Sequence, residues 1–323
     1  MKAVKLVGTS GLKSLHLVDI ARPEPARGQL LIEVKAAGVN FAELQTLNGK
    51  YPPMTQIPYV MGFEAAGTVT AVGPDVHNFK VGDRVTSLVS SGGHAEYALA
   101  DQSMAIPIPE NVSFVDATAI PVNGLTAYAL LKHGAKIQKG DTVLIQAAAG
   151  GVGLFLIQLA KLFGCSKVIA LAGSQEKLEL VNRLGADFAF NYNDDDWQTK
   201  VLAATNEKGV DVVLECVSGA IGDECYKLVA AQGRIIVFGA ANLHDSYSPE
   251  QITQLIRKNL TITGFNLPTM QSELLASCIL ALLKIITNEQ IELHSQVFAL
   301  NNVQSAYAAL AGRTTIGKVI LVP

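Results

Sequence analysis

The chain has 323 residues, of which 49% are hydrophobic and 16% charged. This composition excludes a disordered chain, and the length allows two domains with buried cores. The 25 basic and 28 acidic residues leave a formal net charge of −3, so the charge balance favours no nucleic-acid partner.

The N-terminal part, residues 1–124, is expected to be rich in β-strands. Short apolar runs such as 29–34, 65–72 and 84–88 are separated by glycine, proline, asparagine and aspartate, the pattern of strands joined by turns. This spacing predicts a small barrel or sandwich. The first residues lack the continuous apolar stretch of a secretory signal, so we expect no signal peptide.

From residue 125 onward, strand-like and helix-like segments alternate, which indicates a parallel, doubly wound sheet. The expected strands are 142–147, 167–171, 188–192, 210–215, 234–238 and 260–265. The expected helices are 154–163, 175–184, 195–205, 221–230, 249–258 and 274–286. Residues 297–323 return to strand, helix and strand, and we expect them to fold back onto the first domain.

A glycine-rich turn, residues 148–153, follows the first of these strands and opens the first helix. A dinucleotide pyrophosphate needs this order, because the turn brings the backbone close to the phosphates and the helix N-terminus attracts their charge. The first glycine of the turn allows that approach, and the last lets the helix pack closely on the strand. The predicted pyrophosphate site is Gly150, Gly151, Val152 and Gly153.

The end of the second strand carries no acidic residue. NAD-binding folds usually place a carboxylate there to hold the ribose 2′-hydroxyl, and it would repel the 2′-phosphate of NADPH. Here the segment reads Leu-Ala-Gly-Ser, so Gly173 offers space, Ser174 a donor and Lys177 a cation. Alternatively, Ser174 only caps a helix and Lys177 is solvated. Although Glu176 lies nearby, the missing acid favours NADPH.

Four cysteines, at positions 165, 216, 225 and 278, lack the spacing of a metal site or a redox motif. We expect free thiols in a reducing, cytoplasmic compartment. No run of about 18 uncharged apolar residues is present, so we expect no membrane span.

Several stretches together resemble the zinc-free quinone oxidoreductases, the zeta-crystallin-like branch of the medium-chain dehydrogenase/reductase superfamily. The motifs are 36–41 (Ala-Ala-Gly-Val-Asn-Phe), 62–69 (Gly-Phe-Glu-Ala-Ala-Gly-Thr-Val), 82–85, 93–97 and 121–127. The resemblance implies an α/β protein in which a GroES-like, β-rich catalytic domain (1–124 and 266–323) accompanies a doubly wound, parallel-sheet Rossmann domain (125–265). The nicotinamide is then expected in a cleft between them.

The resemblance also implies that no metal is bound. Zinc alcohol dehydrogenases of the superfamily place a cysteine ligand where this chain has Asn40 and a histidine ligand where it has Phe63. Neither side chain suits Zn²⁺. Without a Lewis acid, oxidation of an alcohol is disfavoured, whereas hydride transfer to an electron-poor quinone or enone remains feasible.

By the same resemblance, Asn40 and Tyr51 line the acceptor side as the candidate catalytic residues. Asn40 is expected to donate to the acceptor oxygen or to hold the nicotinamide ribose, and Tyr51 to stack on the acceptor or donate a proton. The alternatives are a turn residue and surface aromatic cover. A lone His94 is expected to be structural.

The remaining cofactor contacts are also implied by the resemblance. Thr126 is expected near the nicotinamide or a phosphate, or else bonded to its own helix, and Tyr192 beside the adenosine 2′-phosphate. Lys318 reaches the cofactor from the tail, with a solvated strand lysine as the alternative. The strand ends that face the nicotinamide carboxamide are Phe238, Gly239, Phe265 and Leu267.

The expected function is NADPH-dependent reduction of a quinone or an α,β-unsaturated carbonyl compound. Two alternatives stay open: an enoyl-thioester or alkenal double-bond reductase, and a non-catalytic, crystallin-like protein that binds the nucleotide without turnover. The sixth strand, residues 259–265, carries no proline or charge that would block pairing at a sheet edge. We therefore expect a homodimer joined through it.

Overall fold

The computed structural model describes residues 1–52, 56–239 and 248–323, which form two compact units. Unit 1 comprises Met1–Gly124 and Leu293–Pro323, and unit 2 comprises Leu125–Glu292. The first boundary lies where the sequence places it, but the second differs from the expected 265/266. The intervening helix α9 (Ser272–Thr287) packs on α3 (Leu125–Ala129) and so belongs to unit 2.

Unit 1 is built from two sheets. The smaller has the order β2-β1-β4, and the larger has the order β15-β16-β3-β5-β6-β8, with β7 also paired to β3. The strands are β1 (Lys2–Leu6), β2 (Leu15–Asp19), β3 (Gln29–Val39), β4 (Tyr59–Val60), β5 (Glu64–Val72), β6 (Arg84–Leu88), β7 (Tyr97–Asp101), β8 (Ala105–Pro107), β15 (Ser295–Ala299) and β16 (Lys318–Val322). The helical segments are η1 (Gly11–Ser14), α1 (Phe41–Leu47), α2 (Phe114–Ala117), η2 (Ile120–Gly124), η6 (Leu300–Asn302) and α10 (Val303–Ala311).

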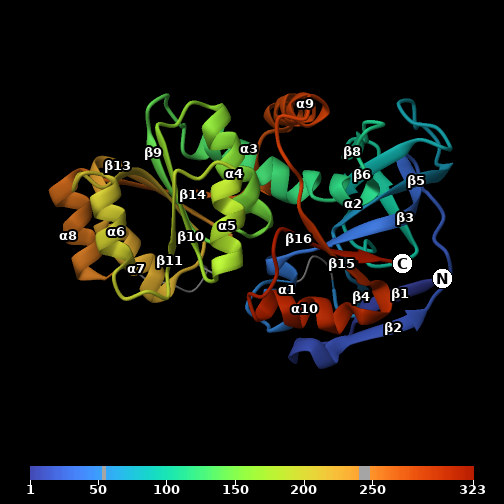
Figure 1. Cartoon of the computed structure of the whole chain (residues 1–323). Coiled ribbons are helices and arrows are strands. Elements are labelled where there is room, and N and C mark those ends of the chain that lie inside the picture. The colour runs from blue at the N-terminus through green and yellow to red at the C-terminus, as the bar shows by residue number, and fades with distance from the viewer. Residues whose placement is uncertain (53–55, 240–247) are drawn as a thin grey trace. The chain divides into compact units, whose positions relative to one another are not determined.

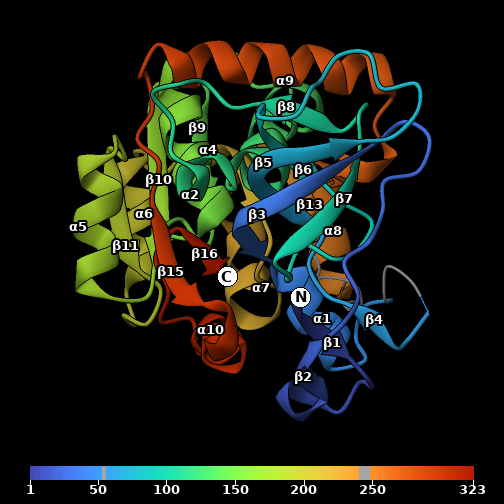
Figure 2. The ribbon, with the colours of Figure 1, turned by 90° about the vertical axis from the view of Figure 1, so that its right-hand side faces the viewer.

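The C-terminal tail completes unit 1, as the sequence predicts. Strand β16 pairs antiparallel with β3, with Val319 opposite Val39 and Ile320 opposite Gly38. Figure 2 shows β15 and β16 in red next to β3 in blue. The apolar residues Leu300, Val303 and Tyr307 of the tail join the core formed by β1 and α1. Burial of this shared apolar surface holds the two ends of the chain together.

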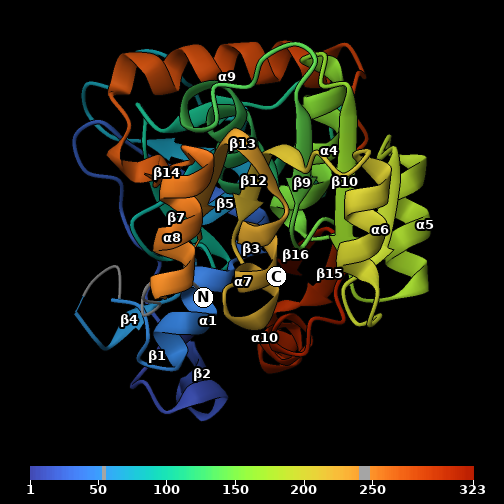
Figure 3. The same cartoon turned by 90° about the vertical axis from the view of Figure 1, so that its left-hand side faces the viewer.

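Unit 2 is a parallel sheet with the order β11-β10-β9-β12-β13-β14, whose central strands Figure 3 shows side by side. The strands are β9 (Thr142–Ile145), β10 (Lys167–Ala172), β11 (Phe188–Asn191), β12 (Val210–Glu215), β13 (Val229–Phe238) and β14 (Thr261–Phe265). Besides α3 and α9, the helical segments are η3 (Leu130–Gly134), α4 (Gly151–Leu162), α5 (Gln175–Arg183), α6 (Trp197–Ala204), α7 (Gly219–Lys227), α8 (Pro249–Lys258) and η5 (Leu267–Thr269).

This sheet is wound in both directions from its first strand. Helices α4 and α5 cover one face, and α6, α7 and α8 cover the other (Figure 1). Chain order reverses between β9 and β12, since β10 lies on one side of β9 and β12 on the other. Ligands of such sheets bind beyond the carboxyl ends of the strands at this switch point. The predicted doubly wound architecture is confirmed.

The helical segment Phe114–Gly134, 21 residues long, is apolar enough by length and composition to cross a membrane. However, 67% of its most apolar window is buried inside the structure, as is typical of a core helix. It contains two π-helical turns, η2 and η3. Such turns are rare and often mark functional sites.

Candidate functional site

The glycine-rich turn of unit 2 has the geometry of a pyrophosphate site. Strand β9 ends at Ile145, two residues earlier than expected, and α4 begins at Gly151 rather than at residue 154. The first bond of the helix runs from the Leu154 N–H to Gly150 O (3.0 Å). The N–H groups of the preceding helical residues thus have no partner within the helix, and their dipoles favour an anion. The turn residues present fit a dinucleotide.

Close packing at the start of α4 requires Gly153. A Cβ atom at this position would lie 2.5 Å from both Ala147 O and Ala148 O. These oxygens are backbone atoms and cannot rotate away. The start of α4 therefore packs against the turn after β9 only with a glycine at this position, in line with the packing role expected of Gly153.

We expect Gly153→Ala to lower the free energy of unfolding by about 1–3 kcal/mol, the usual cost of overpacking, and to weaken NADPH binding, because α4 must shift. Chemical denaturation and calorimetric titration with NADPH measure the two effects. Gly8→Ala is the matched control, since a Cβ there would only make an ordinary contact of 3.6 Å with Ser14 Oγ. Equal stability of the two variants would contradict the steric argument.

Buried hydrogen bonds link the ends of β9 and β12 at the switch point of the sheet. Gln146, just after β9, accepts N–H groups from Cys216 and Val217 (both 3.0 Å) and donates to Glu215 Oε2 (2.6 Å). The Glu215 side chain also accepts from the backbone of Ser218 (2.9 Å). These contacts fix the two loops that border the expected nucleotide position. Neither Gln146 nor Glu215 is among the site residues predicted from the sequence.

The residues expected around a 2′-phosphate do come together at the carboxyl ends of β10 and β11. The Ser174 hydroxyl caps α5 by accepting the Lys177 N–H (3.4 Å), and the Tyr192 N–H bonds to Ala172 O (3.2 Å). Any side chain at Gly173 would collide with the Tyr192 hydroxyl. The site therefore combines a helix N-terminus, a lysine and a tyrosine without a carboxylate at the strand end.

The strand ends assigned to the nicotinamide side also lie together. Phe238 and Phe265 are paired at the ends of β13 and β14, Gly239 follows with φ of +80°, and Leu267 begins η5. They stand at the same edge of the sheet as the glycine turn, since all the strands are parallel. Thr126 is half-buried in α3, which packs against α4. Its contact with the cofactor stays a prediction.

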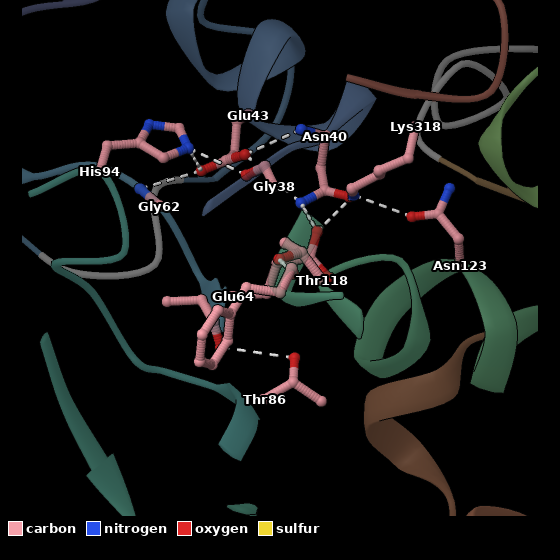
Figure 4. A network of polar contacts seen from close by, with 12 residues as sticks. Gly38, Asn40, Glu43, Gly62, Glu64, Thr86, His94, Thr118, Asn123 and Lys318 are labelled. Atoms are coloured by element: carbon pink, nitrogen blue, oxygen red, sulfur yellow. Dashed lines mark hydrogen bonds and ion pairs between the residues drawn. The ribbon is translucent and has the colours of Figure 1, made fainter. Parts of the chain in front are cut away.

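A buried cation organises the polar centre of unit 1. Lys318 begins β16 and is 2% exposed, and its ammonium donates to Asn40 Oδ1 (2.6 Å), Asn123 Oδ1 (2.8 Å) and Glu64 Oε1 (Figure 4). An ammonium group has three protons, so all of its donors are used. Gly38 provides the space, because a Cβ there would meet both Glu64 and Lys318. With all three protons used inside the protein, Lys318 has no donor left for the predicted contact with the cofactor. It is also not the solvated lysine of the alternative, because it is buried.

The Asn40 amide is also fully engaged. Its Nδ2 donates to Glu64 Oε1 (2.7 Å) and weakly to Glu43 Oε2 (3.5 Å), while its oxygen accepts from Lys318. The side chain is buried, 7% exposed. This geometry leaves it no N–H for an acceptor oxygen, which was the first of its two expected roles. The second, a contact to the nicotinamide ribose, stays a prediction. Tyr51 is half-buried and makes no hydrogen bond in this network of described residues; its catalytic role stays a prediction.

Two buried titratable groups lie beside this network. Glu43 accepts the backbone N–H groups of Asn40 (2.9 Å) and Gly62 (3.0 Å), and burial raises its pKa to about 8. His94 Nε2 donates to Gly38 O (2.9 Å) and lies 4.0 Å from Glu43 Oε1. Burial lowers the pKa of His94 to about 4. His94 is thus neutral and structural in this position, as the sequence analysis expected.

These shifts predict how stability depends on pH. In the unfolded chain Glu43 and His94 titrate near 4.5 and 6.5. Between these values unfolding releases a proton from Glu43 and takes one up at His94, so the two effects cancel. From pH 6.5 to 8 only Glu43 still releases a proton on unfolding, and the free energy of unfolding should fall by about 2 kcal/mol.

Urea denaturation across this range measures how steeply the free energy of unfolding falls with pH above 6.5. The substitution Glu43→Gln should remove this slope. A slope that persists in the variant would assign it to another group.

The donors for a metal are missing from this centre. Among residues 1–52, 56–239 and 248–323, no three His, Cys, Asp or Glu side chains gather as a metal site. The residues that correspond to zinc ligands are Asn40, whose oxygen faces the Lys318 ammonium, and the apolar Phe63. Neither is a zinc ligand.

Each of the two units contains a segment that matches a known protein family. A family model described as "Alcohol dehydrogenase GroES-like domain" matches residues 26–110, and one described as "Zinc-binding dehydrogenase" matches residues 151–282. The chain is 38% identical to the human quinone oxidoreductase over 242 residues, 74% of this chain and 73% of that protein.

Two solved structures align with the whole chain. The Escherichia coli quinone oxidoreductase complexed with NADPH has a TM-score of 0.92 and 29% identity, and the match covers 100% of both chains. A mycobacterial protein complexed with NADPH has a TM-score of 0.91 and 33% identity, again over 100% of both chains.

Proposed function

The chain belongs to the zinc-free quinone oxidoreductase branch of the medium-chain dehydrogenase/reductase superfamily, and on this premise we propose that it reduces quinones or α,β-unsaturated carbonyl compounds with NADPH. The observation that carries the proposal is the group formed by Gly173, Ser174, Lys177 and Tyr192 next to the glycine turn. This group offers a cation and a helix N-terminus where a 2′-phosphate would bind, and no carboxylate at the end of β10 that would repel it, although Glu176 lies in the first turn of α5.

When bound, NADPH supplies a hydride, that is, two electrons with one proton. Quinone, NADPH and one further proton give hydroquinone and NADP⁺; with an enone, the hydride goes to the β-carbon and the proton to the α-carbon. The protein holds the pyrophosphate at the N-terminus of α4 and holds the reactants in place.

Neither alternative gains support from the relatives. Two of the three similar proteins quoted above carry the name quinone oxidoreductase, which favours turnover over simple storage of a nucleotide. An enoyl-thioester reductase would need a site for a long thioester, and no feature described above points to one. Tyr51 remains the proposed contact for the ring of a flat acceptor.

Oxidation of NADPH and of NADH, followed by loss of their near-ultraviolet absorbance across quinones, enones and enoyl thioesters, tests this function. We expect the highest kcat/KM with NADPH and a quinone. Faster turnover with NADH would contradict the phosphate site, and NADPH binding without turnover on any acceptor would favour the non-catalytic alternative.

We also propose that two copies pair through β14, which lies at the edge of the sheet formed by the described strands. The strand contains no proline or charge, and the neighbouring α8 exposes Ile252 (44%) and Ile256 (74%). An unpaired strand edge beside exposed apolar residues favours association. Light scattering at micromolar concentration should give the mass of a dimer, and Thr263→Pro should give a monomer. A monomeric wild type would exclude the dimer.

A cytoplasmic location is proposed as well. The cysteines at positions 165, 216, 225 and 278 are all free thiols, and most are buried, which is typical of a reducing compartment. The proposed partner is a small-molecule acceptor, without nucleic acid or membrane. Fractionation of cells that express the protein tests the location, and recovery in the membrane fraction would contradict it.

A further inference from the structure

We propose that Asn123 is the amide that donates a hydrogen bond to the carbonyl oxygen of the acceptor, and that Lys318 positions it. The proposal rests on the reductase function above and assigns the role of the oxygen-binding donor within it. In this role it replaces Asn40, which the family resemblance favours, with a residue to which the resemblance assigns no role.

The orientation of both amides follows from chemistry. An ammonium group only donates hydrogen bonds, so an asparagine facing it must present its oxygen. Lys318 Nζ lies 2.6 Å from the oxygen of Asn40 and 2.8 Å from that of Asn123. The NH₂ groups of the two asparagines are therefore turned away from the lysine. Figure 4 shows the Asn123 nitrogen on the far side from Lys318.

The two NH₂ groups differ in what they face. That of Asn40 is used by Glu64 and Glu43. That of Asn123 donates to none of the residues the structure describes, although the side chain is only 7% exposed. The Asn123 nitrogen is not fully enclosed and keeps some exposed surface. An oriented but unused donor in an almost buried side chain is what binding of a ligand oxygen requires.

The backbone around Asn123 is also unusual. The residue lies in the π-helical turn η2, where the Gly124 N–H reaches back to Ala119 O (2.9 Å) instead of making an α-helical bond. A π-turn costs regular hydrogen bonding and is frequent at functional sites. Asn123 also precedes Leu125, the first residue of the nucleotide-binding unit, by two positions.

Negative charge develops on the acceptor oxygen during hydride transfer, and a fixed N–H donor stabilises it. Lys318 has no remaining proton for this purpose and acts through Asn123, so it is a positioning residue.

Asn123→Asp tests the donor, because it keeps an oxygen for Lys318 but loses the NH₂ group. We expect kcat/KM for a quinone to fall at least about tenfold, the contribution of one hydrogen bond, while the Kd for NADPH stays within about twofold. Asn301→Asp, an exposed asparagine in the same unit, is the matched control and should match the wild type in both.

A second readout needs no turnover. Substituted phenolates imitate the charged acceptor oxygen, and their affinity, measured by titration, should fall about tenfold in Asn123→Ala, which removes the donor without adding a charge. The matching aryl methyl ethers should bind equally to both proteins. Unchanged phenolate affinity, or an equal loss for the ethers, would overturn the role of Asn123.

If Asn123→Asp does not fold, Asn123→Ala serves for the kinetic comparison, although it removes the oxygen that Lys318 faces together with the NH₂ group. A wild type that oxidises no NADPH overturns the proposed function instead, and the phenolate titration still decides on Asn123.

Discussion

Replacing Lys318 with methionine is expected to lower the free energy of unfolding by about 3–5 kcal/mol, because it leaves the Glu64 carboxylate buried without a cation. Glu64 is 0% exposed, and its Oε1 accepts hydrogen bonds from both Lys318 and Asn40. Methionine fills a similar volume, so the loss measures the charge rather than a cavity. Urea denaturation at constant pH gives the value.

The double variant Lys318→Met with Glu64→Gln should recover much of this loss, since glutamine keeps an oxygen for Asn40 and carries no charge. Lys35→Met is the surface control. Lys35 pairs with Glu33 at 2.7 Å, but both side chains are about 40% exposed, and such pairs contribute about 0–1 kcal/mol. A similar small effect for Lys318→Met would show that the buried charge pair does not form.

Charge reversal at Lys177 is expected to raise the Kd for NADPH roughly a hundredfold while that for NADH changes little. The substitution Lys177→Glu removes a cation and adds an anion at the N-terminus of α5, beside the expected 2′-phosphate. A charge-assisted hydrogen bond contributes about 1.5–3 kcal/mol, and every 1.4 kcal/mol is a factor of about ten in affinity. Titration of the purified protein with each nucleotide measures the ratio.

Lys208→Glu is the control for net charge. Lys208 is exposed and lies just before β12, at the opposite ends of the strands from the phosphate site. We expect it to affect both nucleotides equally and weakly. If Lys177→Glu weakens NADPH and NADH to the same extent, Lys177 does not contact the 2′-phosphate.

Local sequence patterns predicted the nucleotide-binding unit well. All six expected strands are present, because alternating strands and helices carry their own periodicity and the glycine turn is a contiguous motif. The expected strand 234–238 was too short. Strand β13 begins at Val229 and continues past Gln232, whose φ is +64°, and the sequence Ala-Ala-Gln-Gly there is more typical of a turn.

The centre of unit 1 could not be predicted in the same way. Lys318 and Asn40 are 278 positions apart, and Lys318 and Asn123 are 195 apart. No spacing rule links such residues, since the pairing of β16 with β3 brings Lys318 next to Asn40, and Asn123 comes from the separate turn η2. The sequence resemblance located Asn40 but not what its amide faces. Glu43 and Glu64 were overlooked because carboxylates within apolar strands and helices carry no local signal.

The pairing of β16 with β3 also orders events during synthesis. Residues 125–292 form one continuous unit and can complete their sheet as soon as they leave the ribosome. Unit 1 cannot complete its sheet until the end of the chain is synthesised, because β15 and β16 belong to the C-terminal tail. The Glu64 carboxylate likewise contacts its counterion only after Lys318 has left the ribosome. We therefore expect the nucleotide-binding unit to fold before its partner is complete, and a chain truncated within the tail to bind NADPH without reducing an acceptor.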